Sequence, residues 1–181
     1  MPTMETLLNR YIERLKQYNE HTNIYSKSAY DKLPFHIQDS IYLSELITNK
    51  KQVVFDFGSG SGLPAIPIAI MNPLNEVYAI ESKSRKTMFL ESVKQDLKLT
   101  NLTVITKNLY EWKPPSKADI ITAKAFASLE KIQTIAVKCK QTAAQIYIPI
   151  SHHQATQLSN NLAVTIIKVK QHYFLTQKPK K

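Results

Sequence analysis

The sequence predicts an α/β protein with a mostly parallel, seven-stranded sheet, helices on both faces and an N-terminal helical extension. From residue 53 onward, short apolar runs alternate with stretches of helical periodicity, as in β-α-β units. The first apolar run leads directly into the three glycines of the chain, whereas residues 1–50 show helical patterns only. We therefore expect a single domain overall, in which residues 1–50 pack on a core formed by residues 51–181.

Two helices are predicted in the extension. Apolar side chains recur at helical spacing over residues 4–19, and a second helix is expected to start near Pro34, whose fixed φ suits a first turn. The strands of the core are predicted at 53–57, 77–81, 102–106, 119–123, 145–150, 162–170 and 172–177, the last two joined by a tight turn. Its helices are predicted at about 63–71, 84–97 and 128–140.

Composition restricts the class of protein. The chain has 181 residues, enough for one domain, and a formal net charge of +10. Such a charge favours a polyanionic partner, although a lysine-rich surface kept for solubility is the alternative. One cysteine, Cys139, excludes an intrachain disulfide and suits a reducing cytoplasm. The most apolar stretch, Val53 to Met71, contains an aspartate, three glycines and two prolines, so no membrane span is expected.

The glycine loop limits the kind of ligand. A nucleotide-hydrolysing P-loop needs Lys and Ser/Thr after its last glycine, where this chain has Leu63 and Pro64. A dinucleotide fingerprint needs a third glycine at position 63. What remains is the pattern D-x-G-x-G-x-G, formed by Asp56, Gly58, Gly60 and Gly62. It resembles the first motif of class I methyltransferases, which have a doubly wound, Rossmann-like sheet.

Glu81 supports this interpretation, because it closes the second predicted strand about twenty residues after the loop. A carboxylate there can accept hydrogen bonds from both hydroxyls of a ribose. S-adenosylmethionine carries a ribose and a cationic sulfonium but no phosphate, so acidic residues near the loop suit it. The alternative is a plain tight turn beside a solvated strand end.

Further segments resemble one family, the glucose-inhibited division protein B family of 16S rRNA guanine-N7 methyltransferases. The matching segments, in chain order, are YNEHTNIYS (18–26), HIQDSIYL (36–43), DFGSGSGLPAIPIAI (56–70), ESKSRKTMFLESV (81–93) and AKAFASL (123–129). The resemblance implies S-adenosylmethionine as cofactor, 16S rRNA or the small ribosomal subunit as partner, and a cytoplasmic enzyme; we expect a monomer.

The resemblance and the glycine loop together give the expected site residues. The predicted cofactor contacts are Gly58, Ser59, Gly60, Gly62, Leu63, Glu81, Leu109, Tyr110 and Lys124. The candidate contacts to RNA or substrate are His36, Asp39, Lys124 and Phe126. No catalytic residue and no metal are expected, because guanine N7 carries a lone pair and no proton, so positioning suffices.

Several residues allow two interpretations. His36 and Asp39 could contact the active-site rim or anchor their helix, and Phe126 could stack on the target base or pack in the core. Basic residues Lys83, Arg85 and Lys86 could contact RNA phosphates or form a solvated helix face. Adjacent His152 and His153 would point apart, which disfavours a metal site.

The chain also departs from the family pattern. Lys124 stands where the family has an arginine, Asn108 replaces another, and Tyr110 stands in place of a glutamate. The Lys-Gly pair that follows the fifth strand in the family is absent after IPI (148–150). Two alternative functions therefore stay open: a non-catalytic RNA- or ribosome-binding module on the same fold, and a methyltransferase acting on a protein or a small molecule.

Overall fold

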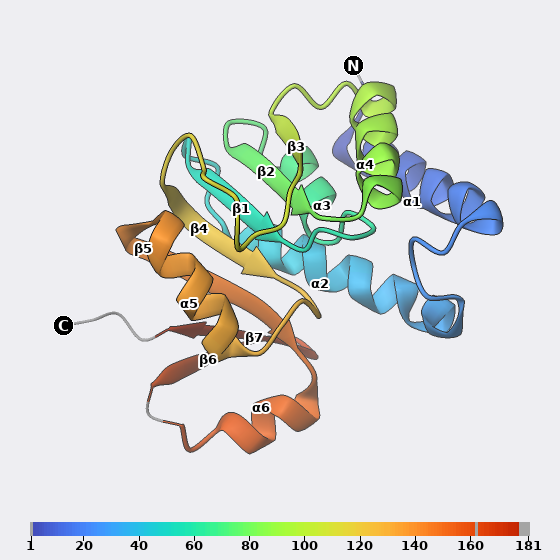
Figure 1. Cartoon of the computed structure of the whole chain (residues 1–181). Coiled ribbons are helices and arrows are strands. Elements are labelled where there is room, and N and C mark those ends of the chain that lie inside the picture. Colours follow the sequence, from blue (N-terminus) through green and yellow to red (C-terminus); the bar gives the residue numbers. More distant parts are fainter. Residues whose placement is uncertain (1, 162, 178–181) are drawn as a thin grey trace.

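A seven-stranded sheet forms the centre of the protein in a computed structural model that describes residues 2–161 and 163–177 (Figure 1). The strand order is β3-β2-β1-β4-β5-β7-β6. The strands are β1 (Val53–Phe57), β2 (Glu76–Glu81), β3 (Leu102–Thr106), β4 (Ala118–Ala123), β5 (Lys140–Ile150), β6 (Val164–Val169) and β7 (His172–Gln177). The first five strands run parallel to one another, whereas β7 lies antiparallel between β5 and β6.

Helices cover both faces of the sheet. They are α1 (Met4–His21), the 3₁₀ helix η1 (Lys27–Lys32), α2 (Leu33–Leu46), α3 (Ala65–Met71), α4 (Ser84–Leu97), α5 (Leu129–Cys139) and α6 (His152–Leu158). The first four α-helices contribute to one apolar cluster, while α5 contributes to a second cluster on the opposite face. Val54 enters the first cluster and Phe55 the second, because successive side chains of a strand point to opposite faces.

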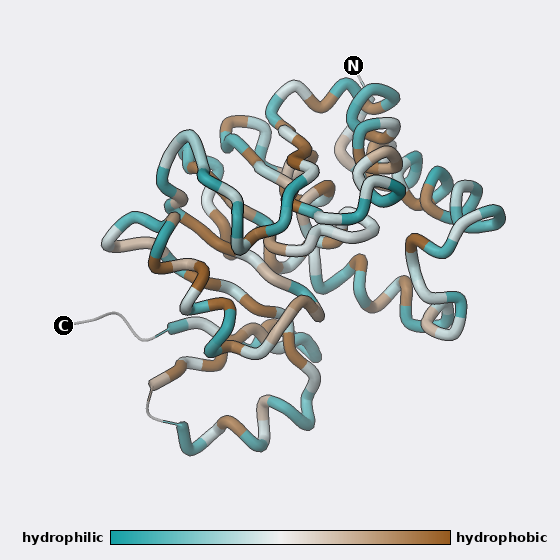
Figure 2. The backbone as a smooth tube through the Cα atoms, viewed as in Figure 1, coloured by the Kyte–Doolittle hydropathy of each residue, from teal (hydrophilic) through white to brown (hydrophobic). Residues whose placement is uncertain are grey.

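Hydropathy along the backbone agrees with these layers. Figure 2 shows hydrophobic residues concentrated in the strands and polar residues along the outer sides of the helices. Burial of such apolar surface is the main favourable contribution to folding, at about 25 cal/mol per Å². In the described residues 2–161 and 163–177, none of the helices combines the length and hydropathy needed to cross a membrane.

The N-terminal extension packs directly on the core. Tyr11 of α1 is fully buried and its hydroxyl donates a 2.8 Å hydrogen bond to the carbonyl of Ser61, inside the glycine loop. Arg10 pairs with Asp96 of α4 at 3.0 Å. Farther along, the buried side-chain amide of Asn72 donates to carbonyl groups near the C-terminal end of α2. The extension therefore braces the loop that follows β1.

Most predicted elements are confirmed. The strands at 53–57 and 102–106 and the helix at 84–97 have the predicted bounds, and Pro34 lies in the first turn of α2. The strand predicted at 162–170 begins at Val164, and Leu162 lies outside the described residues. Two short helices, η1 and α6, were not predicted, because one or two turns leave too few residues to show a periodicity.

Candidate functional site

A cavity of about 420 Å³ opens at the carboxyl ends of the parallel strands. Its lining comes from the ends of four strands and the segments that follow them. The lining residues are Gly58, Ile80, Glu81, Ser82, Lys83, Lys86, Lys107, Asn108, Leu109, Tyr110, Ala125 and Phe126. The strand order reverses between β1 and β4, and ligands of open α/β sheets bind outside the strand ends at such a point.

The glycine loop borders this cavity, and Gly58 is the loop residue that lines it. Gly58, Gly60 and Gly62 all have positive φ, at 70°, 56° and 94°. A Cβ on Gly58 would overlap the ring of Phe126, and one on Gly62 would overlap the side chain of Ile66. At Gly60 the nearest atoms to such a Cβ lie 3.6 Å away, so only the backbone conformation favours glycine there. The three positions thus need glycine for different reasons.

Glu81 joins the loop to the end of β2. Its Oε2 accepts a 3.1 Å hydrogen bond from the backbone N–H of Gly60, and its Oε1 accepts one of 2.9 Å from the N–H of Lys83. The side chain is buried, yet Glu81 also forms part of the cavity wall. The Ser82 hydroxyl also donates to Oε1, over a longer 3.4 Å. Because each carboxylate oxygen can accept two hydrogen bonds, Oε2 keeps room for a ligand hydroxyl, and a second hydroxyl could replace that of Ser82 at Oε1.

Asp56 carries an unsatisfied buried oxygen beside the loop. Its Oδ1 accepts a 2.6 Å hydrogen bond from the Thr122 hydroxyl on β4, but no residue in the described ranges donates to its Oδ2. Burial raises the pKa of Asp56 to about 6, and the hydrogen bond from Thr122 acts in the opposite direction. The Ser59 hydroxyl donates to the backbone carbonyl of Asp56 at 3.0 Å. A buried carboxylate with a missing donor favours a cationic or hydrogen-bond-donating ligand nearby.

Lys124 follows β4 and is partly buried among acidic groups. Desolvation lowers its pKa, while the charges of Asp39 and Asp56 raise it. Asp39 itself, on α2, accepts a 2.6 Å hydrogen bond from Nδ1 of His172 on β7, with both side chains buried. Desolvation raises the pKa of Asp39, and the bond to His172 opposes that shift. Lys124 therefore lies in the field of two carboxylates held by different elements.

His36 has a different partner from Asp39. Its Nδ1 lies 2.5 Å from the hydroxyl of Tyr25. Desolvation and then the positive charges of Lys124 and Lys32 lower the pKa of His36 to about 4. The ring is therefore neutral at pH 7, and its Nδ1 can accept a hydrogen bond from the Tyr25 hydroxyl. Both His36 and Asp39 anchor α2, which was one of the two interpretations from the sequence.

The structure brings only part of the predicted set to the cavity wall. Gly58, Glu81, Leu109, Tyr110 and Phe126 line it, Leu109 being mostly buried and Tyr110 exposed at the rim. The other predicted contacts are not part of the cavity lining; these are His36, Asp39, Ser59, Gly60, Gly62, Leu63 and Lys124. Phe126 also packs against the second apolar cluster, with its ring centroid 6.4 Å from that of Phe57. Both interpretations of Phe126 are compatible with this position.

Several site features have no signal in the sequence. Lys107 and Ala125 line the cavity only because the segments after β3 and β4 turn toward Gly58. The Tyr11–Ser61 and Asp39–His172 contacts join residues 50 and 133 positions apart. Lys83 and Lys86 were expected to face RNA or solvent, and the structure adds them to the cavity wall. In the described part of the chain, no three His, Cys, Asp or Glu residues gather as a metal site would require.

The strand order and the residues around the cavity identify the fold as that of class I methyltransferases. The diagnostic features are the antiparallel β7 between β5 and β6, the glycine loop after β1 and the acid at the end of β2. A methyltransferase from Geobacter sulfurreducens shares this fold, with a TM-score of 0.66 at 13% identity over 94% of this chain and 89% of that one.

The chain belongs to the GidB family, described as rRNA small subunit methyltransferase G, whose model matches residues 4–181. Two proteins named ribosomal RNA small subunit methyltransferase G are similar to it. The one from Pseudomonas entomophila (strain L48) is 38% identical over 125 residues, and the one from Pseudomonas putida (strain GB-1) is 36% identical over 121 residues. These alignments cover 68% and 66% of this chain but only 58% and 56% of the relatives' lengths.

The residues present fit S-adenosylmethionine. Glu81 at the cavity wall suits ribose hydroxyls, and the positive-φ glycines remove the side chains that would keep a ligand from the backbone. Asp56 does not line the cavity, but its buried carboxyl group next to the glycine loop gives a negative potential that suits the positive charge of the methionine part of that molecule.

Proposed function

We propose that this protein transfers a methyl group from S-adenosylmethionine to N7 of a guanine in 16S ribosomal RNA, either free or in the small subunit. The main support for the proposal is the cavity at the ends of the parallel strands, which Gly58 and Glu81 line. The chain that forms this cavity belongs to the GidB family. The net charge of +10 supports a polyanionic substrate.

In this proposal each part of the site has a binding or positioning role. Glu81 accepts the ribose hydroxyls, the segment at Leu109 and Tyr110 borders the adenine, and the glycine loop contacts the methionine part. S-adenosylmethionine supplies the electrophilic methyl group. Lys124 and Phe126, which follow β4, border the methyl acceptor, where Phe126 offers a ring face on which a splayed base can stack.

The proposed reaction needs no general base. Guanine N7 has a lone pair in the plane of the ring and no proton. Its attack on the methyl carbon would break the methyl–sulfur bond and release S-adenosylhomocysteine as a neutral thioether, so the step would require only alignment of the two reactants. The product guanine is cationic. The carboxylates of Asp39 and Asp56, whose charges act on Lys124, offset positive charge in this region.

The test uses the purified chain, radiolabelled S-adenosylmethionine and two substrates: a 16S rRNA transcript and small subunits from cells that lack the family's mark. We expect labelled 7-methylguanosine in at least one substrate, and none with 23S rRNA. Absence of transfer to both substrates would contradict the proposal. An Asp56→Asn/Glu81→Ala variant is the background control, since it removes both carboxylates beside the loop.

The alternative is a non-catalytic RNA-binding module on the same fold. Tyr110 favours it, because this exposed aromatic side chain stands at the cavity rim where the family has a carboxylate. Titration with S-adenosylmethionine separates the two functions: binding at micromolar concentration supports the enzyme, and no binding at millimolar concentration supports the module. We further propose a cytoplasmic monomer, because large exposed apolar residues such as Phe35, Leu74 and Val137 lie on separate elements.

A further inference from the structure

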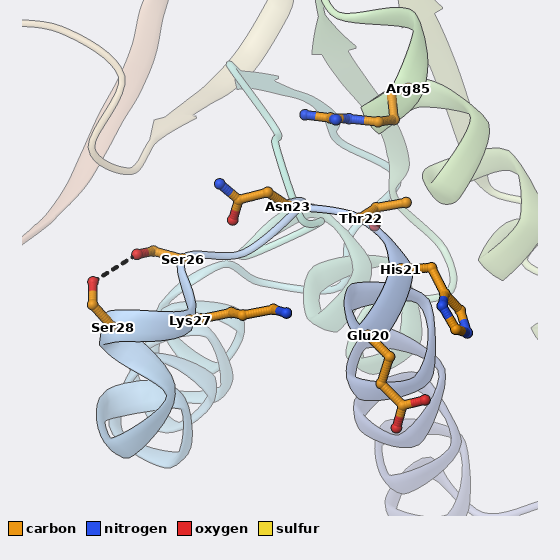
Figure 3. A pocket seen from close by; sticks show the side chains of 8 residues that line it. All are labelled: Glu20, His21, Thr22, Asn23, Ser26, Lys27, Ser28 and Arg85. Carbon is orange, nitrogen blue, oxygen red and sulfur yellow. Dashed lines mark hydrogen bonds between the residues drawn. The ribbon is translucent and has the colours of Figure 1, made fainter.

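An open pocket of about 530 Å³ lies beside the proposed cofactor site, between the α1–η1 connection and the N-terminal end of α4. It is lined by Glu20, His21, Thr22, Asn23, Ser26, Lys27, Ser28 and Arg85. We call it the connection groove. Figure 3 shows that Arg85 reaches it from α4, Asn23 from the connection and Lys27 from η1. The wall thus combines the extension with the core.

The side chains of Arg85, Lys27 and Asn23 lack protein acceptors among the described residues around this groove. The hydroxyl groups of the lining have partners: Ser26 and Ser28 bond to each other at 2.8 Å, and Thr22 donates to the carbonyl of Tyr18. In residues 2–161 and 163–177, neither Arg85 nor Lys27 pairs with a carboxylate, and the side chain of Asn23 makes no hydrogen bond. The single carboxylate of the lining, Glu20, extends away from Arg85 and Asn23 in Figure 3. A guanidinium, an ammonium and an amide around one hollow are donors that suit an anion.

The wall opposite Arg85 is held in place by hydrogen bonds to one buried side chain. The fully buried side chain of Asn19 accepts hydrogen bonds from the N–H groups of Ile24 and Tyr25, at 2.8 and 2.9 Å. Its amide donates to the carbonyl of Tyr25 and the hydroxyl of Tyr30, at 2.8 and 2.6 Å. One side chain therefore fixes the connection at four points, and this fixes the positions from which Asn23 and Lys27 extend.

The groove and the cofactor cavity both border the N-terminal end of α4. Arg85 lines the groove, and the next residue, Lys86, lines the cavity, where its Nζ lies 3.6 Å from the Cβ position of Gly60. An RNA strand held at Arg85 would therefore lie next to the cavity that is proposed to hold the reactants.

We propose that the connection groove binds a backbone phosphate of the RNA substrate, contacted by Arg85 and Lys27 from opposite walls. This inference rests on the proposed function, since it assigns part of the RNA contact to a surface outside the methyl-transfer cavity. The bound phosphate belongs to the strand that carries the target base. Asn23 adds a neutral donor, and the contacts carry no base specificity.

The test compares the Lys27→Ala/Arg85→Ala variant with wild type and with a charge-matched control, Lys50→Ala/Lys94→Ala, whose residues precede β1 and end α4. Affinity for a 16S rRNA transcript is measured over a range of salt concentrations. We expect about a tenfold loss for the groove variant, with the slope of log K against log salt smaller by about one per cation removed. We expect the control and the charge-preserving Lys27→Arg/Arg85→Lys variant to show nearly the same slope of log K against log salt as wild type.

Affinity for S-adenosylmethionine is the readout that separates the outcomes, because neither Lys27 nor Arg85 lines the cofactor cavity. Unchanged cofactor affinity shows that the groove variant is folded. If wild type methylates the transcript and the groove variant binds it as tightly as the control does, the groove assignment is wrong and the proposed function stands. If wild type neither methylates nor binds the transcript or small subunits that lack the mark, both are wrong. Equal protection by inorganic phosphate and the transcript against modification of Arg85 by phenylglyoxal would also contradict a strand-specific site.

Discussion

Asp39 on α2 and His172 on β7 form a buried pair, with 2.6 Å between the carboxylate Oδ1 and the imidazole Nδ1. Phe35 stacks on the same imidazole with ring centroids 4.3 Å apart. This contact ties the N-terminal extension to the antiparallel strand at the far end of the chain. It also keeps the carboxylate of Asp39 where its charge acts on Lys124.

We expect His172→Phe to lower the free energy of unfolding by about 3 kcal/mol, because it leaves the buried carboxylate of Asp39 without its donor. The phenyl ring preserves the stacking on Phe35, so packing loss contributes little. Adding Asp39→Asn to this variant removes the buried charge and should recover part of the loss. Urea denaturation measures all three proteins; a His172→Phe variant as stable as wild type would show that the pair contributes nothing.

Gly58→Ala should weaken both folding and cofactor binding. The added Cβ overlaps the ring of Phe126, and φ at this position is 70°. We expect a stability loss of about 1–3 kcal/mol and a cofactor affinity lower by about tenfold or more. Gly60→Ala is the matched control, because it has a similar φ of 56° but no overlap. Combining Gly58→Ala with Phe126→Ala should restore some stability; if it does not, the overlap is not the cause.

Glu81→Gln should raise the dissociation constant for S-adenosylmethionine by about tenfold or more, because a neutral amide accepts ribose hydroxyl protons more weakly than a carboxylate. Glu81→Ala should be worse, since it also removes the acceptor for the N–H of Gly60. Glu76→Gln changes the same residue type at the opposite end of the same strand and should bind normally. Calorimetric titration checks the order; equal affinities for Glu81→Gln and Glu76→Gln would remove Glu81 from the site.

Asp56 should make stability depend on pH in a defined direction. Burial raises its pKa from 3.8 to about 6 in the folded chain. Between about pH 4 and 6 the folded state therefore binds more protons than the unfolded state, and the contribution of Asp56 to stability falls as pH rises. We expect Asp56→Asn to remove this decrease in the free energy of unfolding, which amounts to about 3 kcal/mol. His36, with a pKa lowered to about 4, contributes the opposite slope over a similar range.

The difference between Asp56→Asn and wild type at each pH is therefore the informative quantity, because the contribution of His36 cancels in it. It is measured by urea denaturation from pH 4 to 7 without cofactor. The variant should gain stability relative to wild type as pH rises through the window. A constant difference would mean that Asp56 titrates with its ordinary pKa.

The local pattern of the sequence was sufficient for most of the fold. Strand β1, helix α4 and strand β3 have the predicted bounds, because apolar periodicity and the glycine loop are properties of neighbouring residues. The same holds for the central pair of the site. Gly58 and Glu81 follow adjacent parallel strands, so their meeting at one edge of the sheet follows from the predicted topology.

The tertiary structure decided what lies around that pair. The sequence placed His36 and Asp39 on one helix face, but Tyr25 and His172 became their partners only when α2 packed on η1 and β7. Likewise, Phe126 lies over Gly58, and Lys27 faces Arg85 across the connection groove, because of turns and packing between distant segments. Such contacts depend on which distant segments the complete fold brings together. The pattern of residues within one segment does not specify the segment against which it packs.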